Sequence, residues 1–68
     1  MKLDEVRKEV RAILANLDHE VAHGDEDALM ERFVRAVAAG ELVGDDARAV
    51  AQTLATDLLS AERVRWSA

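Results

Sequence analysis

LDEVRKEVRAILANLDHEVAH, residues 3–23, is the stretch of sequence that decides the fold. Its apolar side chains recur at steps of three and four residues, at Leu3, Val6, Val10, Ile13 and Leu17. These steps set the side chains on one face of an α-helix, which has roughly 3.6 residues per turn. Leu14 and Val21 widen that face on one side. A two-stranded coiled coil would place charged residues there, so the pattern predicts a helix packed between neighbours in a bundle.

The sequence His23-Gly24-Asp25 predicts the end of this first helix. Gly24 suits the left-handed conformation that ends many helices, and Asp25 can cap the next helix by accepting hydrogen bonds from its first backbone N–H groups. We therefore expect one helix over residues 4–23 and another over 25–39. Apolar residues cover an unusually broad arc of the second helix, which indicates contact with more than one neighbour. On its charged back, Glu31 and Arg35 stand one turn apart and predict an ion pair.

Two glycines bracket the second break, Gly40-Glu41-Leu42-Val43-Gly44. Gly40 is the expected C-terminal cap of the second helix, and Asp45 is the expected N-cap of the third. We predict that Leu42 and Val43, which are apolar within this loop, insert into the core. The third helix is predicted over residues 45–62.

These features predict an all-α fold, a compact three-helix bundle that forms a single domain over residues 1–68 and self-associates. The predicted core consists of Val6, Val10, Ile13, Leu17, Leu29, Phe33, Val37, Leu54 and Leu58. A chain of 68 residues buries only about 60% of the surface that its unfolded form exposes. It has no cysteine, so a disulfide cannot add stability, and association is the ordinary alternative. A homodimer is therefore expected.

The composition argues against several classes of partner and location. The net charge is −5, and this acidic field repels duplex DNA and anionic lipid. No apolar run is long enough to span a bilayer, and MKLDEVRKEV at the start has no signal-peptide core, so a cytoplasmic location is expected. Abundant alanine and arginine with little lysine are typical of a GC-rich gene, as in many bacteria and phages.

One group of residues has the spacing of metal ligands. His19 and His23 stand one helical turn apart, and Glu20 with His23 forms the Glu-x-x-His pair that di-iron helical bundles use. Such a site needs further carboxylates from facing helices, which a dimer would have to supply. The simpler interpretation is two solvated histidines at a helix C-terminus, where a protonated imidazole suits the helix dipole. We therefore predict no metal or other cofactor, with the metal-binding dimer as an alternative.

The second and third helices also invite comparison with a helix-turn-helix DNA-binding protein. The third helix would then be the recognition helix, presenting Arg48, Gln52, Thr53 and Thr56. The turn is longer than the usual roughly 3–4 residues, and Asp45 and Asp46 would face the phosphates. Basic residues do not cluster on one face, as DNA-binding surfaces normally require. DNA binding is thus a second alternative.

No serine, histidine and carboxylate grouping points to nucleophilic catalysis, and no glycine-rich phosphate loop is present, so an enzyme is not expected. The sequence favours a small protein-interaction or regulatory module, such as an adaptor, inhibitor or antitoxin-like protein, that binds through a helix face. The residues predicted to contact a partner or a second copy are Leu29, Met30, Val34, Ala55, Leu59 and Trp66. Trp66 has two interpretations: it anchors an interface, as tryptophan often does, or it folds back onto Leu59.

Overall fold

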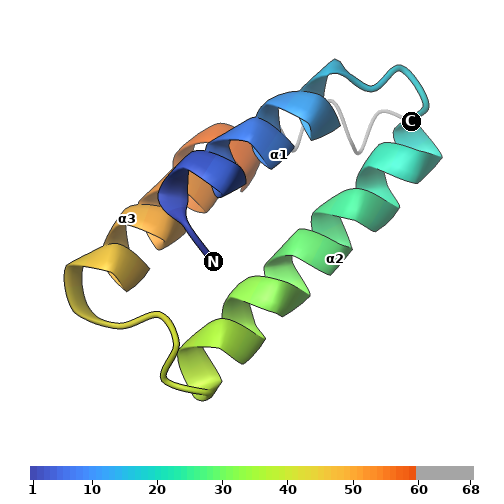
Figure 1. Cartoon of the computed structure of the whole chain (residues 1–68). Helices are drawn as coiled ribbons and strands as arrows, with labels where there is room; N and C mark the ends of the chain where they lie inside the picture. The colour runs from blue at the N-terminus through green and yellow to red at the C-terminus, as the bar shows by residue number, and fades with distance from the viewer. Residues whose placement is uncertain (60–68) are drawn as a thin grey trace.

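Three helices follow one another in the computed structural model, which describes residues 1–59 (Figure 1). They are α1 (Leu3–Ala15), α2 (His19–Ala38) and α3 (Gly44–Thr53), and α3 continues into a single π-helical turn, η1 (Leu54–Leu58). No strand occurs within these 59 described residues. The predicted all-α fold, a compact three-helix bundle, is confirmed.

Helix α1 is the element that holds the bundle together. It packs against α2 on one side and against α3 and η1 on the other, whereas α2 and α3 make fewer direct contacts. Figure 1 shows α1 and α2 running antiparallel, joined by a short corner, with α3 lying beside α1. The outer side of α2 is therefore left without a helix against it among residues 1–59.

The core lies where the three helices meet and is built from aliphatic side chains. Its buried members are Val6, Val10, Ile13, Leu29, Ala36, Leu42, Val50, Leu54 and Leu58. The prediction is confirmed for the three residues of α1 and for Leu29, Leu54 and Leu58. Burial of a Val or Leu side chain stabilises a fold by roughly 1.5–3 kcal/mol, so these residues supply most of the apolar driving force.

Three residues of the predicted core lie elsewhere. Leu17 is 94% exposed, because α1 ends at Ala15 and Leu17 falls in the corner that follows it. Val37 is 43% exposed on the side of α2, and its neighbour Ala36 faces the core instead. Phe33 is half-buried and packs against the edge of the core. Predicting Leu17 and Val37 as core residues was wrong.

The predicted boundary between the first two helices is also wrong. The chain turns at residues 16–18, and Asp18, not Asp25, is the N-cap of α2. Its Oδ1 accepts hydrogen bonds from the backbone N–H groups of Glu20 at 3.1 Å and Val21 at 3.2 Å. These bonds satisfy two of the four N–H groups that a helix start leaves unpaired. Gly24 consequently lies inside α2 and does not end a helix.

The connection between α2 and α3 begins as predicted, with Gly40 in the left-handed conformation at φ +75°. The N–H of Gly40 donates to the carbonyl of Val37 at 3.1 Å, and the N–H of Glu41 donates to that of Ala36 at 3.0 Å. This pair of bonds is the Schellman motif. It supplies hydrogen-bond donors to carbonyls in the last turn of α2 that would otherwise be unpaired.

The rest of this loop confirms one prediction and contradicts two. Leu42 is buried in the core as expected, whereas Val43 is 63% exposed and does not insert. Val43 is also the N-cap residue of α3, which has no side-chain cap. Asp45, the predicted cap, lies in the first turn because the helix already begins at Gly44.

The third helix begins one residue earlier than predicted, at Gly44, and its predicted end at residue 62 lies outside the described residues. Regular α-helical hydrogen bonding ends at Thr53, and η1 follows with the wider π-helical turn. Within residues 1–59, no helix is both long enough and apolar enough to cross a membrane.

Candidate protein-interaction surface

An exposed line of apolar side chains runs along the outer side of α2. Met30, Val34 and Val37 follow one another at steps of four and three residues, which keeps them on one side of the helix. Val34 is 60% exposed, Val37 is 43% exposed, and Met30 is half-buried where it packs against the core. We call these three residues the α2 row.

The α2 row lies on the side of α2 away from the Arg32–Glu9 contact with α1. Arg32 marks the side of α2 that faces α1, because its guanidinium pairs with the Glu9 carboxylate across the two helices. Successive residues are turned by roughly 100° around an α-helix, so the row lies about 140–160° from Arg32. The row therefore borders the part of α2 that no other described helix covers closely.

Acidic residues edge the row on its solvent side. Asp27 and Glu31 lie next to Val34 around the helix and are both well exposed. Their partners are local: His23 Nε2 lies 3.7 Å from Asp27 Oδ2, and Arg35 pairs with Glu31 at 2.9 Å, which confirms that predicted ion pair. Such exposed ion pairs contribute about 0–1 kcal/mol to stability, so basic groups of a partner could take the place of His23 and Arg35 beside the two carboxylates.

The structure separates the six predicted contact residues into three groups. Met30 and Val34 belong to the α2 row. Leu29 is 1% exposed in the core, so predicting it as a contact residue was wrong: it lies roughly 100° around the helix from Met30. Ala55 and Leu59 are exposed along η1 and its end, and Trp66 lies outside the described residues.

Val37 is the residue of the α2 row that the sequence interpretation did not place at the surface. The broad apolar arc of the second helix was the available signal, because an arc wider than one core face must leave some apolar residues at the surface. Which residues those are depends on how the helix is rotated. The Arg32–Glu9 pair shows that rotation, and nothing in the sequence of α2 alone does.

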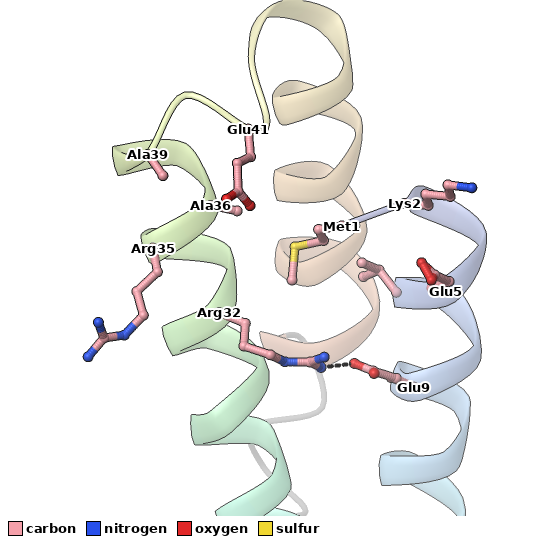
Figure 2. Close-up of a pocket in the computed structure, with 10 residues that line it drawn as sticks. Met1, Lys2, Glu5, Glu9, Arg32, Arg35, Ala36, Ala39 and Glu41 are labelled. Atoms are coloured by element: carbon pink, nitrogen blue, oxygen red, sulfur yellow. Dashed lines mark hydrogen bonds and ion pairs between the residues drawn. The ribbon is translucent and has the colours of Figure 1, made fainter.

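A second surface feature is a groove of about 490 Å³ between α1 and the C-terminal half of α2 (Figure 2). It is lined by Met1, Lys2, Glu5, Val6, Glu9, Arg32, Arg35, Ala36, Ala39 and Glu41. Figure 2 shows the Arg32 side chain reaching across the groove to Glu9, and Arg35 pointing away from it. The Arg32–Glu9 pair thus crosses one end of the groove, and cations and anions are mixed along its rim, so the groove favours neither an apolar helix nor a ligand of one charge.

The predicted metal ligands do not form a complete set. His19 and Glu20 are exposed in the first turn of α2, and His23 follows one turn later. The histidines were expected at a helix C-terminus, but the corner at residues 16–18 puts them near the N-terminus of α2 instead. Within residues 1–59, no group of three or more histidine, cysteine, aspartate or glutamate side chains is placed to hold a metal ion.

The helix proposed to read DNA presents a different face from the expected one. Arg48, Gln52 and Thr56 are exposed, but Thr53 is buried beside the core, so predicting Thr53 as a surface residue was wrong. Two aspartates occupy the first turn of α3, and Arg48 is the single cationic residue between residues 44 and 58. This face has too few cations to attract a phosphate backbone.

Comparison with known proteins adds no family to this description. No protein-family model matches the chain, and neither the curated proteins nor the solved structures contain a significant match.

Proposed function

We propose that this protein is a small interaction module that binds an amphipathic α-helix of a partner protein along the α2 row. The observation that carries the proposal is that Val34 and Val37 are exposed and, together with the half-buried Met30, form one apolar line along α2. Apolar side chains at this spacing are the feature through which helices recognise one another. A role as an adaptor, inhibitor or antitoxin-like regulator follows from binding of this kind.

The charges around the row define the chemistry of the partner helix. Asp27 and Glu31 edge the row, and the whole chain has a net charge of −5. A partner helix with an apolar stripe flanked by lysine or arginine would be attracted by this surface, and one flanked by glutamate would be repelled. The partner is thus expected to be a basic amphipathic helix.

The direct test is titration of the protein with a synthetic helical peptide as long as α2. The peptide has leucines at helical spacing and lysines on both flanks, and a second peptide replaces the lysines with glutamates. We expect micromolar binding of the lysine peptide only. Val34→Ser and Val37→Ser should each weaken it about tenfold, on the order of 1.4 kcal/mol, measured by calorimetry.

Val21→Ser is the matched control for these two variants. Val21 lies on the same helix and is about as exposed as Val37, but it is on the side that faces α1. Its replacement should leave peptide binding unchanged. The proposal is wrong if neither peptide binds, if the glutamate peptide binds equally well, or if Val21→Ser weakens binding as much as Val34→Ser.

The role of Trp66 stays a prediction, tested with the same peptide. If Trp66 anchors the partner, Trp66→Ala should weaken binding by about 2 kcal/mol or more, as for other tryptophan anchors. Trp66 is the only tryptophan in the chain, so its fluorescence reports on this residue alone. An unchanged affinity together with solvent-like emission would exclude the anchor role.

A further inference from the structure

A second apolar feature lies at the corner between α1 and α2, away from the α2 row. Leu17 is 94% exposed there, the most exposed of the large hydrophobic residues within residues 1–59. Its position is set by hydrogen bonds on both sides. Asn16 N–H donates to the Ile13 carbonyl at 3.2 Å, Asn16 Oδ1 accepts from Asp18 N–H at 2.9 Å, and Asp18 caps α2. The hydrogen-bonded corner therefore presents a leucine to solvent, and a backbone that is already held in place loses little entropy on binding.

A hollow that could receive this leucine lies close by, between α1 and η1. It measures about 540 Å³, and we call it the α1–η1 hollow; its lining residues are Arg7, Val10, Arg11, Leu14, Thr56 and Asp57. The buried side chain of Val10 and the half-exposed Leu14 give it an apolar part. Leu14 and Leu17 are three positions apart in the sequence, so their Cα atoms are no more than about 11 Å apart. The corner that contains Leu17 is therefore close in space to the end of the hollow that Leu14 lines.

The charges of the two features are opposite. Asp18 and Glu20 stand beside Leu17, whereas Arg7 and Arg11 line the hollow with one carboxylate, Asp57. Neither arginine takes part in an ion pair within residues 1–59. The corner is thus acidic and the hollow has a net positive charge, so one complements the other.

We infer that this chain forms a two-fold symmetric homodimer in which Leu17 of each copy enters the α1–η1 hollow of the other. The occupant is a second copy because one patch contains both the inserting residue and the receiving hollow, as a two-fold interface requires. Glu20 of each copy then faces Arg11 of the other. The small core gives this association a clear benefit, because a chain of 68 residues has limited apolar surface to bury alone.

The first test measures mass by sedimentation velocity, from low micromolar to high micromolar concentration. The wild-type chain should pass from a 7.5 kDa monomer to a species of twice that mass. Leu17→Ser should weaken dimerisation at least tenfold without changing the helical circular dichroism, because Leu17 makes little contact within its own chain. Val34→Ser, on the α2 row, should dimerise like the wild type.

A charge exchange tests the orientation of the two copies. Arg11→Glu and Glu20→Arg should each weaken self-association, because like charges then face each other in both contacts of the dimer. An equimolar mixture of the two variants should recover the dimer, since every contact again joins a glutamate and an arginine. The inference is overturned if the wild type remains a monomer, if Leu17→Ser dimerises normally, or if the mixture fails to associate. These outcomes are independent of peptide binding at the α2 row, for which Leu17→Ser should behave as wild type.

Discussion

At the scale of single residues, Asp18 has the clearest structural role outside the core. Its carboxylate accepts two backbone hydrogen bonds at the start of α2. Asp18→Ala should lower the free energy of unfolding by about 1 kcal/mol, because two helix N–H groups lose their acceptor. Urea unfolding followed by circular dichroism measures this change.

Asp25→Ala is the control, and it separates the observed helix boundary from the one that the sequence indicates. Asp25 is exposed inside α2, where alanine has the higher helix propensity, so its replacement should be neutral or slightly stabilising. If Asp25→Ala lowered the free energy of unfolding more than Asp18→Ala, a helix start at His19 would be contradicted.

Leu29 gives a second prediction at this scale, because sequence alone assigned it to an interface. It is almost fully buried, so Leu29→Ala should lower the free energy of unfolding by about 2–5 kcal/mol. A core of this size supplies only about 3–5 kcal/mol in total, so the variant should be largely unfolded. Val34→Ala on the same helix should stay within about 0.5 kcal/mol of the wild type in urea unfolding. Equal effects of the two substitutions would contradict the rotation of α2 about its axis that buries Leu29 and exposes Val34.

At the scale of the elements, two glycines should respond in opposite ways to the same substitution. Gly24 lies inside α2, and a Cβ there would meet nothing within 4 Å, so Gly24→Ala should stabilise the fold by about 0.5–1 kcal/mol. Gly40 has φ +75°, so Gly40→Ala should destabilise it by about 1–2 kcal/mol. Thermal unfolding of the two variants provides the comparison. A destabilised Gly24→Ala would mean that the first helix ends at this glycine, as its sequence context indicates.

The same two glycines show how far helix boundaries could be read from sequence. Gly40 ends α2 as predicted, because its left-handed conformation is a local property that glycine favours over all other residues. The corner at residues 16–18 contains no glycine, and Leu17 and Val21 continue the apolar spacing of α1 across it. Periodicity therefore suggested one long helix where two helices happen to be in phase, and the weaker signal of Asn16 and Asp18 was overlooked.

The change of helix type within the third helix was not predicted, for a different reason. The π-helical turn η1 adds one residue to a turn of helix, and no glycine or proline accompanies it in the sequence. The residues that face the core, Leu54 and Leu58, were nevertheless predicted correctly. Spacing identifies buried residues over one or two turns, but it does not detect a change of helix type between them.

At the scale of the whole molecule, the two proposed surfaces lie on different parts of the bundle and use different charges. The α2 row has an acidic edge, whereas the α1–η1 hollow contains two arginines. Sequence analysis predicted both self-association and partner binding but assigned them to one set of residues. The division into two surfaces depends on which sides of α1 and α2 face each other, and this follows from the Arg32–Glu9 contact between residues 23 positions apart.

A homodimer also predicts that stability depends on protein concentration, because association stabilises the folded state by mass action. Two unfolded chains arise from each dimer, so a tenfold higher concentration adds about 0.7 kcal/mol per chain once dimers dominate. For a domain of this size, that should raise the thermal midpoint by about 3–6 °C. Differential scanning calorimetry over two decades of concentration should show this rise for the wild type and for Val34→Ser. Leu17→Ser should unfold at a midpoint independent of concentration, and a rise equal to that of the wild type would place the dimer contact elsewhere.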